Sequence, residues 1–264
     1  MKPLWLSGLV LWSPIYPTLE RFIEADAFSP PQEEPEVSWV SSRLLRGSSR
    51  LTRILLHLAG QAVEKSRKNP HTIATVYASS YGEIETMVRL LETIFRGDGQ
   101  LSPMRFKNSV HNAASGLGSI GQGNKAFSTA IAGGLRSFEA GMLEAIAWAQ
   151  SEGGDVVVAC ADDVVPPPLT VPVPHEAFGI ALVLSTERSH DSLGCITEIV
   201  PLSEAHPFPS KVFGRTLPST LPPNPSAHAL PLFEMLLQQR GGLVPLAFEV
   251  DHPYALMVHP CSSL

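Results

Sequence analysis

The most informative residues for chemistry lie where a predicted strand over 125–131 turns into a predicted helix. Such a turn is a usual position for a catalytic nucleophile, because the helix N-terminus lowers the pKa of a thiol and offers backbone N–H groups to an oxyanion. The turn residues here are Ile131, Ala132, Gly133 and Gly134. None of them is Cys or Ser, so the turn has the shape of a nucleophile site without the nucleophile.

Four other side chains are weaker candidates for a nucleophile or a base: Ser128, Thr129, Cys160 and His111. Ser128 and Thr129 lie on the strand that leads into the turn, and Cys160 ends a separate hydrophobic run. A buried cysteine more often behaves as a small hydrophobic residue. His111 lies among small residues, where a structural hydrogen bond is the simpler interpretation, since a general base needs a nucleophile beside it.

Two further patterns could bind a ligand, and each has a structural alternative. Gly116-Leu-Gly118-Ser-Ile-Gly121 matches a dinucleotide-binding pattern, but a helical segment precedes it where a strand is required. We therefore expect close helix packing at these glycines. Asp162-Asp163 follows a strand, yet no third ligand lies at metal-binding spacing, so solvated loop acids or a cap are expected. The sequence predicts no metal site and no cofactor.

Composition narrows the class of protein. A formal net charge of -6 over 264 residues, with no basic stripe, argues against a nucleic-acid partner. The three cysteines have neither disulfide nor metal spacing, which is typical of a reducing, cytoplasmic environment. The apolar run at 4–12 resembles a signal peptide at first, but prolines and acids follow it, which favours a buried strand. No run approaches the roughly 20 apolar residues of a membrane span.

Hydrophobic periodicity gives an α/β order of elements. Buried strands are predicted over 4–12, 72–78, 125–131 and 155–160, and helices over 42–68, 82–96, 109–121 and 133–150. Phe178–Ser185 and Cys195–Val200 predict a hairpin, and a helix over 227–240 precedes strands near 243–250 and 254–259. Proline-rich loops are predicted at 26–38, 164–174 and 207–225. Apolar strands separated by helices indicate a sheet covered on both faces.

The order of these motifs resembles the N-terminal half of the β-ketoacyl synthases, over residues 4–200. The stretch from Phe106 to Ala130 has that family's small-residue helix, Gly-rich turn and Phe-Ser-Thr-Ala strand. Asp155–Ala159, Glu176–Ser185 and Cys195–Val200 are similar to the strands that follow. Within the family, Tyr81-Gly82-Glu83 looks like the truncated ketosynthase-like chain length factors of aryl polyene and polyketide systems.

The resemblance implies half of a thiolase-like fold: a mixed, mostly parallel five-stranded sheet with helices on both faces, plus a short α+β tail. Residues 1–200 would form the ketosynthase-like domain, and residues 201–264 a proline-rich connection and a divergent tail. The family's catalytic cysteine would fall between Ile131 and Gly133, where this chain has none. The family's two catalytic histidines lie beside Gly-Thr-x-Thr and Gly-His sequences in its C-terminal half. None of the late histidines of this chain lies in such a sequence.

A chain of this kind is expected to be catalytically silent and to pair with a full-length β-ketoacyl synthase. It would shape that partner's acyl tunnel in fatty-acid or polyketide-type polyene biosynthesis. The expected interface and tunnel residues are Ala126, Phe127, Ser128, Thr129, Ala130, Phe138 and Met142. Two alternatives stay open. One is an active acyltransferase with a non-standard nucleophile. The other is a scaffold that binds acyl carrier protein, whose acidic surface would suit Arg43, Arg46, Arg50 and Arg53.

Overall fold

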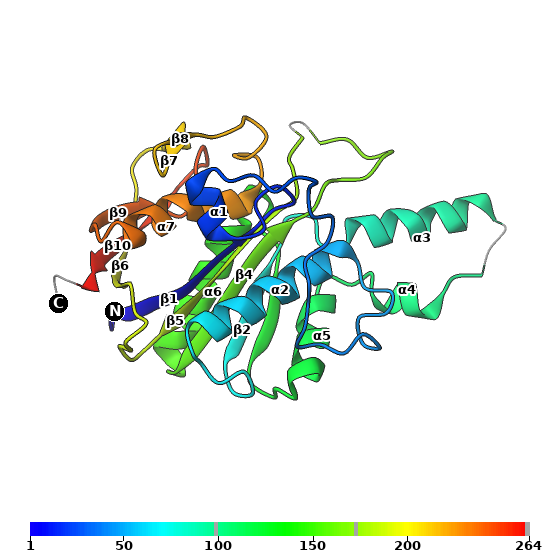
Figure 1. The fold of residues 1–264 in the computed structure, drawn as a ribbon, viewed down its shortest axis with the longest axis horizontal. Helices are drawn as coiled ribbons and strands as arrows, with labels where there is room; N and C mark the ends of the chain where they lie inside the picture. The colour runs from blue at the N-terminus through cyan, green and yellow to red at the C-terminus, as the bar shows by residue number, and fades with distance from the viewer. Residues whose placement is uncertain (98–99, 172–173, 262–264) are drawn as a thin grey trace.

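The computed structural model describes residues 1–97, 100–171 and 174–261, and an eight-stranded sheet lies at its centre (Figure 1). The strands follow the spatial order β3-β2-β4-β5-β1-β6-β10-β9. Their bounds are β1 Leu4–Trp12, β2 Ala74–Ala78, β3 Ser128–Ile131, β4 Asp155–Asp162, β5 Phe178–Ser185, β6 Gly194–Pro201, β9 Gly242–Pro245 and β10 Tyr254–Pro260. A separate ribbon pairs β7 (Lys211–Val212) with β8 (Arg215–Thr216). Positions 172–173 of the predicted loop and 262–264 of the predicted tail lie outside the described residues.

The strand directions confirm the expected arrangement of the N-terminal half and extend it. β3, β2 and β4 pair in parallel, whereas β5 runs antiparallel to both β4 and β1. β1 to β4 therefore point the same way, and the sheet is mixed and mostly parallel over its first five strands. The sheet does not end at five strands, because β6, β10 and β9 continue it. The tail thus contributes its longer strands to the same sheet.

The predicted hairpin between β5 and β6 is wrong. β1 lies between them and pairs antiparallel with β5 along one edge and with β6 along the other. Nearly every residue of β1 is buried, so water cannot bond its backbone N–H and C=O groups. Each edge of β1 therefore needs a neighbouring strand. The order of the strands therefore depends on the backbone hydrogen bonds of the whole sheet. The hydrophobic pattern of β5 and β6 alone does not show which strand lies between them.

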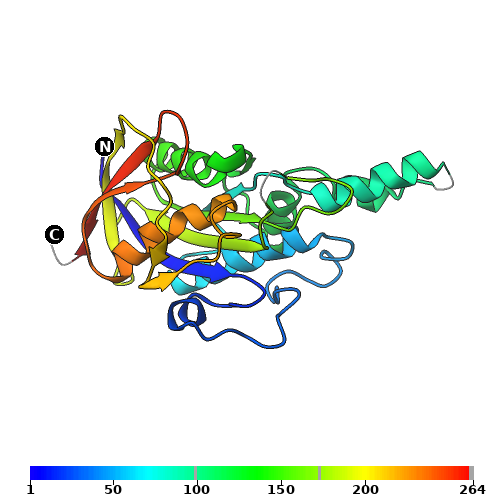
Figure 2. The same ribbon diagram turned by 90° about the horizontal axis from the view of Figure 1, so that it is seen from above.

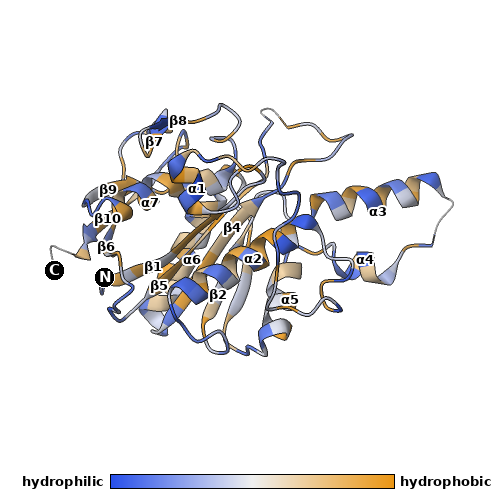
Figure 3. Cartoon of the chain, viewed as in Figure 1, coloured by the Kyte–Doolittle hydropathy of each residue, from blue (hydrophilic) through white to orange (hydrophobic). Residues whose placement is uncertain are grey.

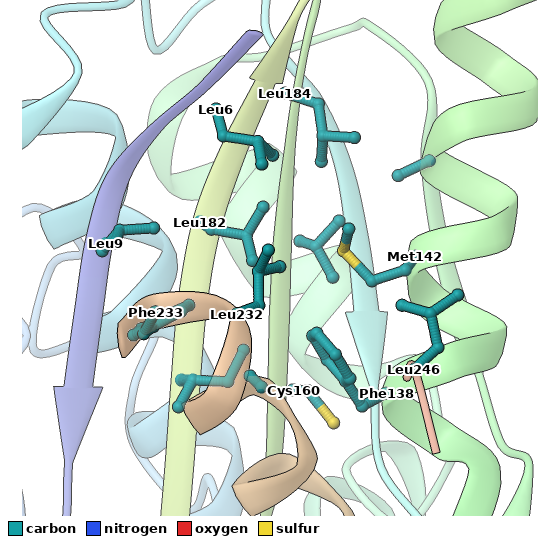
Figure 4. Packing of buried hydrophobic residues seen from close by; sticks show 14 of the residues in the cluster. Leu6, Leu9, Phe138, Met142, Cys160, Leu182, Leu184, Leu232, Phe233 and Leu246 are labelled. Carbon is teal, nitrogen blue, oxygen red and sulfur yellow. The ribbon is translucent and has the colours of Figure 1, made fainter. Parts of the chain in front are cut away.

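Helices cover both faces of the sheet, as expected (Figure 2). α2 (Arg50–Lys65) and α5 (Ala113–Gln122) pack on one face, around core residues such as Leu56 and Val183. α6 (Ser137–Ser151) packs on the other face together with two tail elements, the 3₁₀ helix η2 (Pro225–Ala229) and α7 (Leu230–Leu237). Phe233 of α7 is fully buried there (Figure 4). Both faces are dry, which explains the continuous apolar strands.

α2 begins at Arg50, later than the predicted start at 42. Ser49 caps the helix, because its hydroxyl oxygen accepts a hydrogen bond from the Thr52 backbone N–H at 2.9 Å. Leu45 still reaches the core, but from a turn before the helix. Apolar residues at helical spacing therefore mark what is buried, whereas the cap decides where the helix starts.

Two helices, α3 (Ile84–Arg96) and α4 (Pro103–Lys107), project from the body and are called the arm below (Figures 1 and 2). One side of α3 is strongly apolar (Figure 3). Its large exposed residues are Met87, Leu91, Ile94 and Phe95, the last with 84% of its surface accessible. This face has no partner within the part of the chain that the structure describes, so it resembles half of an interface. Within the same ranges, no helix has the length and apolar character needed to cross a membrane.

Candidate functional site

The turn between β3 and α6 has the expected elbow geometry; we call Ile131–Ser137 the elbow. β3 ends at Ile131, a 3₁₀ turn over Gly134–Arg136 follows, and α6 begins at Ser137. Gly134 has a φ of +58°, a left-handed conformation that favours glycine. The chain thus reverses sharply at the C-terminal edge of the parallel strands, where ligands meet open α/β sheets.

Hydrogen bonds within the elbow engage the Gly133 N–H and the Gly134 carbonyl. The Gly133 N–H donates to the Ser137 hydroxyl oxygen at 3.1 Å, and that hydroxyl donates to the Gly134 carbonyl at 2.7 Å. Ser137 is fully buried. An N–H that is already paired inside the turn offers less to the oxyanion of a substrate. Ser137 therefore occupies the Gly133 N–H from within the elbow, a feature that the sequence did not reveal.

An ion pair between a half-buried arginine and a buried glutamate lies at the start of the helix behind the elbow. The Arg136 guanidinium donates two hydrogen bonds to the Glu139 carboxylate, of 2.5 and 2.6 Å, and Glu139 is 1% exposed. The bonds to Glu139 raise the pKa of the Arg136 guanidinium. The same guanidinium approaches the carbonyls of Asp251 and His252 at 3.4 Å, in the turn between β9 and β10. The elbow is thereby connected to the tail.

The weaker nucleophile candidates lie in unreactive surroundings. The Ser128 hydroxyl accepts from Thr75 at 2.7 Å and lies 2.6 Å from the Ser115 hydroxyl, so its partners are hydroxyls. Thr129 neighbours it on the same short strand. Cys160 is fully buried, and burial raises the pKa of its thiol; the Ser226 hydroxyl donates to its sulfur at 3.3 Å. Among the described residues, no hydrogen bond joins any of these candidates to a histidine or a carboxylate, the side chains that usually act as a base for a nucleophile.

His111 lies elsewhere, beside Ser79 and Gly82. Its Nε2 lies 3.2 Å from the Ser79 carbonyl oxygen, and its ring fills the space beside Gly82 that a Cβ would occupy. The structure does not bring His111 into hydrogen-bond contact with Ser128, Thr129 or Cys160. No group of three or more metal-ligating side chains occurs among the described residues.

The expected tunnel residues Phe138 and Met142 lie on the core side of α6. They are 1% and 0% exposed and pack near Cys160 and Leu246 (Figure 4). They fill the volume behind the elbow.

Two buried carboxylates, at Asp162 and Glu83, join the strand and helix ends at the edge of the sheet that carries the elbow. From the sequence, neither of them is identified as a buried, hydrogen-bonded group. Asp162 is fully buried, not solvated, and accepts from the Ser79 hydroxyl at 2.7 Å and the Ser80 N–H at 2.8 Å. Glu83 accepts from the hydroxyls of Ser49 at 2.8 Å and Thr52 at 2.6 Å. Burial raises the pKa of both carboxyls. The Ser and Thr residues near the strand and helix ends were the available signal, because such hydroxyls can satisfy a carboxylate without a cation.

The expected close packing at the glycine pattern 116–121 is confirmed for Gly118 and Gly121, whereas a Cβ on Gly116 would meet nothing within 4 Å. The pattern lies within α5, and a Cβ on Gly118 would sit 2.8 Å from the Tyr77 hydroxyl oxygen. A Cβ on Gly121 would sit 2.9 Å from a Val40 methyl carbon. The helix therefore approaches the sheet and the loop before α2 too closely for larger residues.

β3 forms one edge of the sheet, and a partly exposed aromatic side chain lies beside it. The Thr75 N–H donates to the Phe127 carbonyl and the Ser79 N–H to the Ile131 carbonyl. Backbone groups alternate along a strand, so those of Ser128 and Ala130 face the free edge. Phe127 is 39% exposed beside this edge. The free edge, Phe127 and the apolar face of the arm are called the edge surface below.

Sequence comparison identifies the family. Residues 22–218 match the family model of the β-ketoacyl synthase N-terminal domain, which is most of the 264 residues. No curated protein matches the chain.

Solved structures agree with this match. The ketosynthase ApeO in complex with its chain length factor ApeC from Xenorhabdus doucetiae gives a TM-score of 0.66 at 18% identity, covering 96% of this chain and 98% of that chain. The ishigamide ketosynthase/chain length factor gives 0.60 at 16% identity, covering 76% of this chain and 67% of that chain. A β-ketoacyl synthase from Burkholderia phymatum STM815 gives 0.60 at 14% identity, over 89% and 70%. These likenesses show a thiolase-like ketosynthase fold, and with the sequence match they mean that the chain belongs to the β-ketoacyl synthase family through its N-terminal domain.

Proposed function

We propose that this protein is a catalytically silent ketosynthase-like subunit that pairs with a full-length β-ketoacyl synthase and shapes its acyl tunnel. The observation that carries the proposal is the elbow. It has no cysteine between Ile131 and Gly133, where the family's cysteine would fall, and its Gly133 N–H is already paired with Ser137. Condensation needs a nucleophile and free oxyanion donors. The elbow has no nucleophile, and the N–H of Gly133 is already engaged by Ser137, so we assign the chain a structural contribution.

The edge surface supports pairing with such a synthase. A free strand edge beside exposed apolar side chains is an interaction surface, and a chain that keeps it uncovered tends to aggregate. Two of the similar solved structures are of ketosynthases with chain length factors. In the proposed assembly, Ala126, Phe127, Ser128, Thr129 and Ala130 meet the partner. Phe138 and Met142 limit the tunnel behind the elbow. The pathway is a fatty-acid or polyketide-type polyene synthesis in the cytoplasm.

Catalytic silence is tested by exposing the chain to acetyl and hexanoyl thioesters and recording its intact mass. We expect no acyl adduct on this chain, whereas a full-length synthase with its cysteine is acylated in parallel. An adduct that maps to Ser128, Thr129 or Cys160 would instead establish the acyltransferase alternative and overturn the proposal.

Pairing is tested by co-expression with a full-length synthase, followed by native mass spectrometry. Ala130→Pro removes an N–H that faces the free edge, so it should leave the fold intact yet weaken pairing at least tenfold. Phe95→Asp on the arm should have the same effect. Leu243→Asp on β9, the opposite edge, is the matched control and should pair normally. Unchanged pairing of both edge-surface variants would contradict the proposal.

The scaffold alternative has weaker support. Arg50 lies 3.6 Å from Asp163, and Arg53 lies 3.4 Å from Glu34. Half of the proposed basic face is thus neutralised from within the chain, so it offers an acidic carrier protein little net charge.

A further inference from the structure

A cavity of about 460 Å³ lies between the segment after β1, the start of β5 and the residues that follow β8. Its lining residues belong neither to the elbow nor to the edge surface. Its volume falls within the range of small-molecule sites. Its walls are mainly apolar; they include Ile15, Phe178, Leu217, Pro218 and Leu221. The cavity is therefore a separate candidate site for a small ligand.

One cation lines this cavity, and aromatic rings hold it in place. The Arg215 guanidinium lies 4.8 Å from the ring centre of Tyr16 and 5.0 Å from that of Phe22. The two rings meet edge to face at 5.4 Å. Arg215 donates to the Tyr16 hydroxyl oxygen at 2.8 Å and to the Phe22 carbonyl. The two neighbouring rings and the two hydrogen bonds hold the guanidinium in position, so little side-chain entropy is lost when it binds a ligand.

Arg215 keeps donors and charge to spare. A guanidinium has five N–H groups, and two of its nitrogens are engaged in the bonds to Tyr16 and Phe22. Within the described part of the chain, no carboxylate lies at ion-pair distance from it. Glu176 lines the same cavity, but it is exposed and accepts from the Thr220 hydroxyl at 3.2 Å. The charge of Arg215 is thus uncompensated at close range.

We infer that this cavity binds a small monocarboxylate with an apolar chain, the carboxylate on Arg215 and the chain among Phe178, Leu217 and Leu221. Arg pairs well with the planar carboxylate, and the walls fit a hydrocarbon tail. Glu176 at the rim opposes a second negative charge, so it favours monoanions over dianions. The inference does not rest on the proposed function, because every residue that it uses lies in this chain and away from the edge surface.

The test is isothermal titration of the full chain with hexanoate, alongside hexanol and hexylamine. We expect hexanoate to bind at least tenfold more tightly than either of the others, because only it forms charge-assisted hydrogen bonds with Arg215. Arg215→Gln should weaken hexanoate binding at least tenfold. Glu176→Gln should strengthen it, since a nearby negative charge is removed. Equal binding of hexanoate and hexanol would overturn the inference, and so would no binding.

Two further variants test whether hexanoate binds in this cavity and not elsewhere on the protein. Arg188→Gln is the matched control, because Arg188 also lies over an aromatic ring, 5.0 Å from the centre of Trp5, but lines none of this cavity. It should bind hexanoate normally. If Arg215→Gln fails to fold, Leu217→Trp, which fills the cavity and keeps the cation, should abolish binding. Binding that survives Leu217→Trp would refute the assignment. Pairing with a synthase is measured separately, so either idea can fail alone.

Discussion

At the scale of single residues, two buried carboxylates are held by neutral hydrogen-bond donors and not by cations. Asp162 and Glu83 are held by hydroxyl and backbone N–H donors near the ends of β2, α2 and α3. Such carboxylates bring the segments together because each accepts several bonds at once. The sequence showed an acid at a strand end, but not that distant hydroxyls would surround it.

Replacing Asp162 is expected to destabilise the protein strongly. Asp162→Ala leaves the Ser79 hydroxyl and the backbone N–H groups of Ser80 and Tyr81 without their acceptor. We expect a loss of about 3 kcal/mol in the free energy of unfolding, measured by urea denaturation. Asp162→Asn keeps one acceptor oxygen and should lose less than half as much. Equal losses would mean that the charge, not the bonds, matters.

His228 should make stability depend on pH. Burial lowers the pKa of this imidazole from 6.5 to about 4, among Phe208 and Phe248. Between these values the unfolded chain takes up a proton that the folded chain refuses, so stability falls as the pH is lowered from about 6.5 to about 4. The loss in the free energy of unfolding that His228 causes over this pH range reaches about 3 kcal/mol.

His228→Phe tests this directly, because it keeps a ring and removes the titration. Asp162 and Glu83 act in the opposite direction, since burial raises the pKa of their carboxyls and the folded chain holds their protons at higher pH. The informative measurement is therefore the difference between variant and parent in unfolding free energy from pH 7 to pH 4. A difference that is constant with pH would contradict the assignment.

At the scale of elements, close backbone contacts decide how helices meet the sheet. Gly8 has a φ of +62° in the middle of β1, where the register with β5 shifts. A Cβ there would collide with the Ala62 carbonyl oxygen of α2. The strand and the helix can therefore approach only where a side chain is missing.

Gly8→Ala is expected to cost about 3 kcal/mol, because it adds both left-handed strain and a clash with α2. Gly123→Ala is the matched control: Gly123 has a φ of +60° but nothing within 4 Å of its Cβ position. This control should cost about 1 kcal/mol, from strain alone. Chemical denaturation of both variants gives the difference, which is the energy of the contact. Equal losses would show that α2 can move away.

At the scale of the whole molecule, the tail completes the core. η2 and α7 cover the sheet beside α6, and β10 and β9 extend the sheet beyond β6. Asn224 connects the tail to the end of β4 and the start of β5, because its side-chain amide donates to the carbonyls of Asp162, Glu176 and Phe178. The division at residue 200 stays a prediction about domains.

Cooperative unfolding tests that division. Phe233→Ala creates a cavity in the shared core, so it should lower the unfolding free energy by about 3–5 kcal/mol. We expect one calorimetric transition in both the parent and the variant, shifted as a whole. Two separate transitions, with only one of them moved, would instead establish two independent domains.

The sequence by itself determined the local features of this protein: the buried strands, the elbow without a nucleophile, the close-packed glycines and the amphipathic helices. These depend on residue type and spacing within a few turns of chain, and the order of motifs also carried the family. Only the tertiary structure decided that β1 separates β5 from β6, that the tail joins the sheet and that Ser137 engages the Gly133 N–H. It also decided which polar groups surround Asp162 and Arg215. Those features depend on which distant backbone and side-chain groups must satisfy one another, and no local pattern records that choice.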